Sequence, residues 1–401
     1  MRILYFADTR FPLERANGIQ TMHTCHALAG RAHTVTLVVR PDTAQPRRDP
    51  FVYYGLPASA GLQVVAVPSA GGRVARRLRF LQDALVRATF RGRADLIFTR
   101  DLGVASALVR LPRPFRPPVV YESHAFSPEF ARLLPALLSG ATRASEVKLD
   151  RLTRRERHVW RKADGYVTIT SGLALELATH FGSTRQVTVV SDGVRLRPDR
   201  AFEEPHIGPS PLVGYAGHLY PWKGVDVLLE ALATVPGSRG LIIGGHPAEP
   251  DLDRTRARAR ALGIEGRVTF TGPMAPTEVA GGIRRAEILV LPNTGTTVSA
   301  RYTSPLKLFE YLAAGRPIIA SDLPALREVL RHEENCLLTP AGEAPALADA
   351  IRRLAAEPGL ASRIARQAFA DAVLYSWEQR AIRLERLFES LNARGRKARD
   401  V

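Results

Sequence analysis

Short runs of β-branched and aliphatic residues alternate with helical patterns along the whole of this 401-residue chain. The runs lack the strict polar alternation of a half-exposed strand, which indicates strands buried on both faces of parallel sheets. Helices between the strands would cover both faces, so the pattern predicts an α/β fold. The expected strands are residues 3–7, 33–39, 64–67, 96–99, 119–122, 166–170 and 187–190, followed by 213–216, 241–243, 268–270, 288–291, 318–320 and 336–338.

The stretch 193–211 separates these two series of strands. It carries four prolines, charges of both signs and little apolar periodicity, which is the composition of a linker. We therefore expect two doubly wound domains, with ligands at the carboxyl ends of the strands. The expected divisions are residues 1–192, a hinge at 193–211, a second domain at 212–374, and a terminal helix with a basic tail at 375–401.

Basic residues outnumber acidic ones, 56 to 39, and the sequence pI is about 10.6. This balance fits either an ordinary basic surface, with arginine inflated by a GC-rich coding bias, or a surface that attracts the phosphates of a nucleotide, an anionic lipid or a nucleic acid. Only two cysteines occur, which excludes a disulfide scaffold and a cysteine-rich zinc module. No apolar run reaches membrane-spanning length, and the first residues resemble a buried strand rather than a signal peptide. The expected location is therefore cytoplasmic.

The first segment that could carry chemistry is 213–229, VGYAGHLYPWKGVDVLL. An apolar strand leads into Gly217, and Lys223 and Gly224 open an amphipathic helix. A helix N-terminus beside a lysine offers backbone amides and a positive charge to a phosphate. The alternative is an ordinary strand–loop–helix joint with an exposed lysine. Because only five of the 56 basic residues are lysines, a lysine at this position favours the phosphate site.

The second such segment is 303–322, TSPLKLFEYLAAGRPIIASD. Ser304 is the expected N-cap, and Pro305 the first residue of the helix. Lys307 then falls in the first turn, where a cation opposes the helix dipole unless an anion is bound there. Glu310 lies one turn further on. It is either part of that site or a solvated carboxylate paired with Lys307.

Together these two segments resemble the retaining GT-B glycosyltransferases of family 4. Members of that family have a strand, a glycine and a Lys-Gly that opens a helix. They also have a helix with a glutamate, followed by Gly-x-Pro and a strand. The sequence of 304–310, Ser-Pro-Leu-Lys-Leu-Phe-Glu, resembles a variant subgroup of the family. The resemblance implies two Rossmann-like domains facing a central cleft, with the C-terminal helix packing back toward the N-terminal domain.

The resemblance also implies the roles of particular residues. Lys223 would neutralise the donor diphosphate, and Glu310 would accept hydrogen bonds from the ribose hydroxyls. Catalysis would rest on Lys223, Glu310 and a histidine, His124, that contacts the donor sugar. No cofactor or metal is expected; the co-substrate would be a nucleoside diphosphate sugar, UDP- or GDP-linked. The expected donor-binding residues are Asn17, Gly18, Gly217, His218, Lys223, Arg301, Tyr302, Thr303, Ser304, Pro305, Leu306, Lys307 and Glu310.

Two positions depart from the family pattern. His218 stands where the family usually has arginine, and Arg301 is a candidate to replace that charge. Tyr302 stands where the family usually has a glutamate that contacts the transferred sugar, so the donor sugar is left open.

The N-terminal half offers weaker candidates. Asn17 and Gly18 follow the first strand and open a helix, where a glycine either lets a ligand approach or simply starts the helix. His124 ends the strand at 119–122 and is either a sugar contact or a loop residue. Glu122 is an alternative polar contact. Arg100 and Asp101, after the strand at 96–99, are either acceptor contacts or only a cap for the next helix.

Two basic stretches, 73–93 and 143–162, lie in the N-terminal half. In the first, Leu78, Leu81, Leu85 and Ala88 are expected to form the face that packs on the sheet. The basic face of such a helix can rest on anionic lipid. A lipid-linked acceptor and a peripheral contact with the inner face of a membrane are therefore expected partners. Nucleic acid is not, because no reading motif is present.

The expected function is transfer of a sugar from a nucleoside diphosphate to a saccharide, lipid-linked or small-molecule acceptor, with retention of configuration. Two other readings share the architecture. One is another enzyme, such as a sugar-nucleotide epimerase or a phosphorylase. The other is a two-lobed binding protein without catalysis. The paired lysine and glutamate segments favour the transferase.

Overall fold

The computed structural model describes residues 1–68, 71–89, 94–138, 141–183 and 187–397. The chain forms two compact units, and the first point at which it passes from one to the other falls within helix α5 (Ser127–Leu137). The first unit comprises Met1–Phe130, Ala144–Asp192 and Trp377–Val401, and the second comprises Ala131–Arg143 and Gly193–Ser376. The segment 193–211 is thus grouped with the second unit and the terminal helix with the first. Arg91, Arg93 and the tail residues 398–401 lie outside the described residues.

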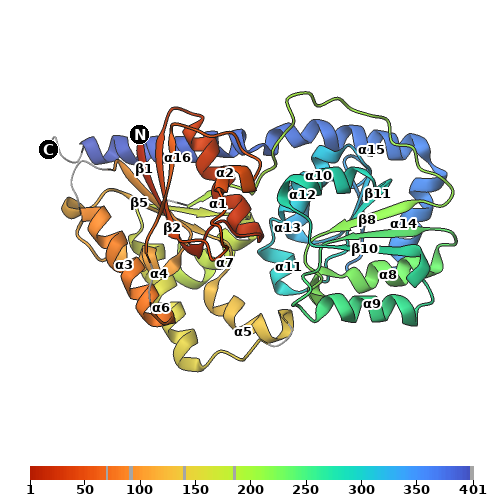
Figure 1. The fold of residues 1–401 in the computed structure, drawn as a ribbon, viewed down its shortest axis with the longest axis horizontal. Coiled ribbons are helices and arrows are strands. Elements are labelled where there is room, and N and C mark those ends of the chain that lie inside the picture. The colour runs from red at the N-terminus through yellow and green to blue at the C-terminus, as the bar shows by residue number, and fades with distance from the viewer. Residues whose placement is uncertain (69–70, 90–93, 139–140, 184–186, 398–401) are drawn as a thin grey trace. The chain divides into compact units, whose positions relative to one another are not determined.

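A seven-stranded parallel sheet forms the centre of the first unit, in the order β3-β2-β1-β4-β5-β6-β7 (Figure 1). Its strands are β1 (Arg2–Arg10), β2 (Thr34–Arg40), β3 (Leu62–Ala66), β4 (Leu96–Thr99), β5 (Val119–Ser123), β6 (Gly165–Thr168) and β7 (Val187–Val189). Its other helices are α1 (Ala16–Ala29), α2 (Pro50–Tyr53), α3 (Arg73–Thr89), α4 (Leu102–Leu108), α6 (Glu146–Lys162), α7 (Ser171–Phe181) and α16 (Trp377–Lys397).

A six-stranded parallel sheet forms the centre of the second unit, in the order β10-β9-β8-β11-β12-β13. Its strands are β8 (Leu212–Ala216), β9 (Arg239–Ile243), β10 (Val268–Gly272), β11 (Ile288–Leu291), β12 (Ile318–Ser321) and β13 (Leu337–Thr339). Its helices are α8 (Val225–Thr234), α9 (Asp251–Ala261), α10 (Pro276–Arg284), α11 (Thr297–Arg301), α12 (Leu306–Ala314), α13 (Pro324–Arg327), α14 (Ala344–Ala356) and α15 (Pro358–Asp371).

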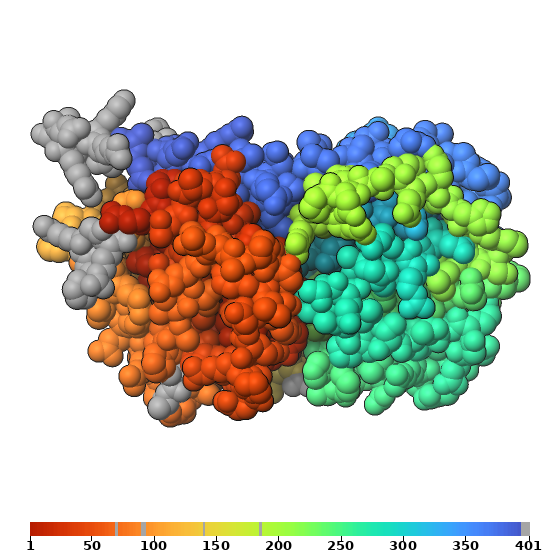
Figure 2. Space-filling view, turned by 45° about the horizontal axis from the view of Figure 1, so that its top comes forward, coloured from red at the N-terminus to blue at the C-terminus, as the bar shows by residue number. Residues whose placement is uncertain are grey.

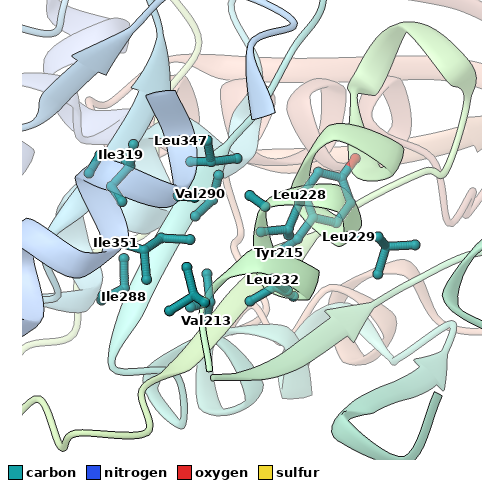
Figure 3. Packing of buried hydrophobic residues seen from close by; sticks show 14 of the residues in the cluster. Val213, Tyr215, Leu228, Leu229, Leu232, Ile288, Val290, Ile319, Leu347 and Ile351 are labelled. Carbon is teal, nitrogen blue, oxygen red and sulfur yellow. The ribbon is translucent and has the colours of Figure 1, made fainter. Parts of the chain in front are cut away.

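Each strand expected from the sequence corresponds to an observed strand, so the predicted α/β class is confirmed. The apolar runs set this outcome, because a strand buried on both faces needs no polar alternation. In the second unit, Val213 and Tyr215 of β8 pack with Leu228 of α8 and Ile351 of α14 (Figure 3). A second cluster on this sheet joins Ala216 and Leu289 to Leu308 and Leu312 of α12. Helices therefore bury both faces of the sheet.

Helix α3 turns a different face to the sheet than the sequence suggested. Phe80, Ala84 and Ala88 are its buried residues, whereas Leu78 is 61% exposed. Of the expected face, Ala88 is buried and Leu81 and Leu85 are half-buried, so the prediction was wrong at Leu78 and missed Phe80 and Ala84. The physical reason is that Phe80 packs edge-on against Phe6 of β1, with ring centroids 6.5 Å apart. Ion pairs from Arg77 to Asp8 and Asp101 hold the same rotation of the helix.

The terminal helix α16 packs on the first unit, beside α1 (Figures 1 and 2). Trp377 stacks on His23 of α1 at 5.3 Å between ring centroids, and Phe388 meets Phe98 of β4 at 5.4 Å. Each fully buried side chain of this size stabilises the fold by roughly 1.5–3 kcal/mol. The predicted return of the last helix to the N-terminal domain is thus confirmed. Among the described helices, none is both long enough and apolar enough to cross a membrane.

Candidate functional site

The order of strands marks one edge in each sheet where a ligand is expected. In the second unit β8 lies between β9 and β11, and in the first unit β1 lies between β2 and β4. The connections leave the strands in opposite directions on the two sides of β8 and of β1. Ligands of open parallel sheets bind outside the carboxyl ends of the strands at such a point. The residues after β8 and β11, and those after β1, β4 and β5, are therefore the candidates.

In the second unit, a short turn carries Lys223 to the end of β11. Residues Pro221–Lys223 form one 3-10 turn, and Gly224 follows it with φ +72°. A Cβ on Gly224 would lie only 1.7 Å from the carbonyl oxygen of Pro292, directly after β11. Only glycine therefore fits this close approach. Helix α8 begins at Val225, so the turn lies at the N-terminus of a helix, where an anion is favoured.

Lys307 reaches the same strand edge from helix α12. Its side chain is buried, and Nζ lies 3.7 Å from the ring centroid of Tyr215, in β8. Nζ also lies beside Gly217, since a Cβ there would be 3.7 Å from it. Within the described part of the chain, Nζ makes no hydrogen bond. Burial, reinforced by the nearby charge of Lys223, holds the pKa of Lys307 well below its usual range.

Lys223 and Glu310 carry shifted pKa values as well. Burial lowers the pKa of Lys223 to about 7, and its Nζ lies 3.7 Å from the centroid of the Trp222 ring. Burial raises the pKa of Glu310 to about 7, although the charge of Lys307 opposes the shift. Nζ of Lys307 makes no hydrogen bond to any described residue, Glu310 included, so the hydrogen-bonded pair considered from the sequence does not form. Buried ionisable groups of this kind are costly, and they cluster at functional sites.

Helix α12 begins one residue later than expected. It starts at Leu306, and Pro305 occupies the N-cap without a side-chain cap hydrogen bond. The prediction of Ser304 as the N-cap, with Pro305 inside the helix, was therefore wrong. The proline ring fixes φ near the value needed for entry into a helix, and the backbone carbonyl of Pro305 accepts from the Leu308 amide at 2.9 Å. Lys307 still lies in the first turn.

The two positions that depart from the family pattern have their own environments. The His218 ring stacks on Tyr220, with centroids 4.8 Å apart, and its Nδ1 lies 3.2 Å from Oε2 of Glu249. The carboxylate of Glu249 thus faces the ring of His218. Tyr302 is 2% exposed and Thr303 is also buried, whereas Arg301, the last residue of α11, is exposed.

In the first unit, Gly18 is explained by packing rather than by a ligand. A Cβ there would lie 2.4 Å from the carbonyl oxygen of Leu13 and 2.5 Å from the hydroxyl of Tyr54. That hydroxyl donates to Leu13 O at 2.7 Å and accepts from Leu13 N at 2.8 Å, which fixes the loop before α1 to the end of α2. Asn17 is half-buried beside it, and its Oδ1 accepts no hydrogen bond from any described residue.

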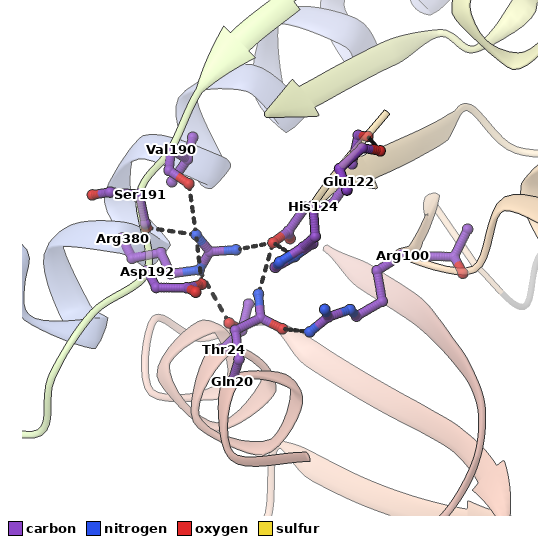
Figure 4. Close-up of polar contacts among 12 residues, drawn as sticks. Gln20, Thr24, Arg100, Glu122, His124, Val190, Ser191, Asp192 and Arg380 are labelled. Carbon is purple, nitrogen blue, oxygen red and sulfur yellow. Dashed lines mark hydrogen bonds and ion pairs between the residues drawn. The ribbon is translucent and has the colours of Figure 1, made fainter. Parts of the chain in front are cut away.

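The other first-unit candidates lie at the ends of β4 and β5. Asp101 caps α4, accepting from the Val104 amide at 2.8 Å, which agrees with the cap considered from the sequence. His124 follows β5, and its Nε2 lies 2.7 Å from Oε1 of Glu122. The same oxygen accepts from Gln20 and from Arg380 of α16 (Figure 4).

Comparisons with known proteins agree for both halves of the chain. Residues 18–193 match the family described as "Glycosyl transferase 4-like domain", and residues 210–357 match "Glycosyl transferases group 1". Together the two matches take in most of the chain. The chain belongs to the glycosyltransferases.

Individual relatives and structures are similar to this glycosyltransferase to different extents. D-inositol 3-phosphate glycosyltransferase of Rhodococcus jostii (strain RHA1) is 32% identical over 243 residues, 56% of this chain and 52% of that protein. The chain thus spans about half the length of the curated relatives it matches. Sucrose-phosphate synthase from Thermosynechococcus elongatus superposes with a TM-score of 0.77 at 21% identity, covering 98% and 99% of the two chains. Anabaena HepE in complex with UDP-glucose gives 0.71 at 18%, covering 98% and 100%. The fold is therefore GT-B.

Sequence reasoning missed three buried polar residues that lie beside the strand ends of this glycosyltransferase. Asn293, directly after β11, is fully buried, and neither atom of its amide forms a hydrogen bond with a described residue. Gln20 and Arg380 surround Glu122 in the first unit. A signal for Arg380 was available, because it falls on the apolar stripe of the terminal helix with Trp377 and Leu384. A charge on such a stripe indicates a buried partner.

Proposed function

We propose that this glycosyltransferase moves a sugar from a nucleoside diphosphate sugar to an acceptor hydroxyl, with retention of configuration. The observation that carries the proposal is the group of Lys223, Lys307 and Glu310 at the carboxyl edge of β8 and β11. Two lysines with depressed pKa values, of which Lys307 makes no hydrogen bond to any described residue, suit a ligand that brings its own negative charge. A diphosphate is such a ligand.

Each residue then has a role in donor binding. Lys223 and Lys307 would neutralise the diphosphate, and the amides of Ser304, Leu306 and Lys307 would hold its oxygens at the start of α12. Glu310 would accept from the ribose hydroxyls. The family usually has a positive charge at position 218, where this chain has a histidine. We assign the role of that charge to Lys307, which belongs to the variant sequence of 304–310. These groups would supply the charge in place of a metal, and the donor is expected to be UDP- or GDP-linked.

The chemistry follows from where charge develops. The bond between the anomeric carbon and the β-phosphate oxygen breaks, and its electron pair stays on that oxygen. Fixed positive groups there lower the barrier most. The acceptor oxygen bonds to the same face of the sugar, and its proton passes to the leaving phosphate. His124 would contact the sugar from the first unit, which would also hold the saccharide or lipid-linked acceptor.

A thermal-shift screen tests the donor site. A ligand that binds only the folded state raises the melting temperature by mass action. We expect one of UDP, GDP, ADP or TDP to stabilise the wild type, and Lys223→Ala and Glu310→Ala to lose that response. Lys162→Ala, an exposed lysine on α6, is the control and should keep it. Equal responses of all the variants, or no response to any nucleotide, would contradict the proposal.

We also propose that α3 contacts an anionic membrane. Val74 and Leu78, one turn apart on this helix, are 72% and 61% exposed, with Arg73 and Arg79 exposed beside them. Exposed apolar residues flanked by arginines suit a lipid interface. Leu78→Ser should weaken sedimentation with phosphatidylglycerol vesicles. Leu175→Ser, a leucine 70% exposed on α7, should not. Equal binding to neutral phosphatidylcholine vesicles would exclude the charge-based contact.

A further inference from the structure

The oxygen Oε1 of Glu122 accepts three hydrogen bonds in the interior of the first unit (Figure 4). The donors are Nε2 of Gln20 at 2.7 Å, Nε2 of His124 at 2.7 Å and a guanidinium nitrogen of Arg380 at 2.6 Å. Glu122 itself is fully buried. An acceptor that receives three donors while buried has to be ionised or strongly polarised.

Arg380 keeps this carboxylate ionised. Burial alone would raise the pKa of Glu122, but the charge of Arg380, together with His124 and the charge of Arg100, outweighs burial and brings the pKa to about 2. Arg380 is 1% exposed and is held on every side. It donates to Oγ1 of Thr24 at 3.1 Å and to the carbonyl oxygens of Val190 and Ser191 at 2.9 and 2.6 Å. The last helix thus fixes the end of β5.

An ionised acceptor decides which nitrogen of His124 carries the proton. Since Oε1 of Glu122 can only accept, Nε2 of His124 has to be the donor. Burial and the nearby charge of Arg100 lower the pKa of His124, so the ring is neutral near pH 7. In a neutral ring with a proton on Nε2, the other nitrogen, Nδ1, has a free lone pair. The side chain of His124 remains 21% exposed, so a ligand can reach it.

We propose that Glu122, held by Arg380, is a positioning residue that fixes His124 as the Nε2–H tautomer and leaves Nδ1 to accept a hydrogen bond from a hydroxyl of the transferred sugar. This inference rests on the proposed function. It assigns a specificity: the donor sugar must present a hydroxyl to this nitrogen. A deoxy sugar lacking that hydroxyl would leave the acceptor without a partner and would transfer slowly.

Asp192 also belongs to this cluster, and it does not change the role assigned to Glu122. Atoms of Glu122, His124 and Asp192 lie within 4.8 Å of one another, a spacing that could also suit a metal ion. Nη1 of Arg380 lies 4.0 Å from Oδ1 of Asp192. Nη2 of the same guanidinium pairs with Oε1 of Glu122. The cation that faces these two carboxylates is therefore the guanidinium of Arg380, carried by the chain itself.

The first test reads the tautomer directly. In the full chain labelled with 15N-histidine, long-range NMR correlations distinguish a protonated Nε2 from a protonated Nδ1, and His124→Gln assigns the signal among the ten histidines. We expect Nε2–H in the wild type. Glu122→Gln keeps an acceptor oxygen and should keep this tautomer. The double change Glu122→Met with Arg380→Met should lose it.

The second test measures the rate of sugar transfer. Glu122 and Arg380 are changed together because removing one alone leaves a buried charge without its partner. The double variant should lower kcat about 10–100-fold, the range found when a residue that orients a ligating histidine is lost. The Kd for the nucleoside diphosphate alone should not change. The matched control is Arg31→Met with Glu385→Met, an ion pair between the end of α1 and the same helix α16.

The outcomes separate this inference from the proposed function. Nδ1–H in the wild type, or an unchanged kcat in the double variant, would overturn the inference and leave the donor site intact. An equal loss of kcat in the control would show that α16 acts only through stability, and this too would overturn it. Absence of any transfer by the wild type, with no stabilisation by nucleoside diphosphates, would overturn both proposals.

Discussion

At the scale of single residues, the two lysines of the second unit are the most informative. Lys307 lies over the ring of Tyr215 and Lys223 over that of Trp222, and burial depresses the pKa of both. The sequence indicated them because lysine is rare in this chain. It could not indicate that Lys307 is buried and Lys223 half-buried, since burial depends on how α12 and the turn before α8 pack against the sheet.

Proton uptake on nucleotide binding follows from these pKa values. Near pH 8 Lys223, with a pKa of about 7, is mostly neutral, and a bound diphosphate would raise that pKa and draw in about one proton. Affinity for UDP or GDP should therefore fall as pH rises above 7. Calorimetry in two buffers of different ionisation enthalpy measures the uptake. Lys223→Met should reduce it, and a binding heat that is independent of the buffer would contradict the prediction.

Gly224 gives a prediction about stability. Its left-handed φ and the 1.7 Å approach to Pro292 mean that Gly224→Ala strains the backbone and forces the turn away from β11. We expect a loss of more than about 2 kcal/mol in the free energy of unfolding, measured with urea. Gly263→Ala is the control, because φ there is +69° but an added Cβ meets nothing within 4 Å. It should cost about 1 kcal/mol.

At the scale of helices and strands, the sequence predicted the strands well and the rotation of some helices poorly. Strands are recognised from their own apolar runs, as in β4 and β11, whose bounds match. The rotation of α3 depends on which of its residues can pack against the rest of the unit. Phe80 packs against Phe6, and Arg77 forms ion pairs with Asp8 and Asp101, so these contacts join residues far apart in the chain. No local pattern contains that information.

Helix α6 and strand β6 share a buried carboxyl group that makes stability depend on pH. Burial raises the pKa of Glu156 to about 7, and its Oε1 accepts from the hydroxyl of Tyr166 at 2.7 Å. Between pH 4.5 and 7 the folded chain holds a proton that the unfolded chain has lost. Stability from this group is therefore fully present at low pH and is lost as pH rises through 7.

Glu156→Gln mimics the protonated group, so it should remove this dependence. At pH 8 we expect the variant to be more stable than the wild type by up to about 3 kcal/mol, and at pH 5 to be close to it. Urea unfolding at the two pH values measures the difference. Glu146→Gln, at an exposed position on the same helix, should show no such gain. A variant less stable than the wild type at pH 8 would mean that Glu156 is ionised in the folded state.

At the scale of the whole molecule, the chain leaves the first unit at Asp192 and returns to it at Trp377. The apolar stripe of the last helix predicted that it would pack, and the resemblance to the family predicted where. Arg380 was not foreseen, because its partners Glu122 and Thr24 lie more than 250 residues earlier in the chain. The polar groups that complete a site come from such distant segments, whereas glycines and lysines within one loop can be read locally.

Hydrogen exchange with and without ligands can separate the contributions of the two units. A nucleoside diphosphate alone should slow exchange of amides in 217–225 and 303–310, since those segments carry Lys223, Lys307 and Glu310. The complete nucleotide sugar should also slow exchange at 17–20 and 122–125, the segments of Asn17, Gln20 and His124. Ordering a segment by a ligand lowers the population of its open states, and mass spectrometry measures that change for each peptide.

Glu310→Ala should lose the protection at 217–225 and 303–310 and, with it, the protection at 17–20 and 122–125, because the sugar arrives attached to its nucleotide. Protection at 17–20 by the nucleoside diphosphate alone would instead place Asn17 and Gly18 against the phosphates, as the resemblance implied. Protection at neither segment, from either ligand, would mean that the lysines of the second unit do not hold a nucleotide.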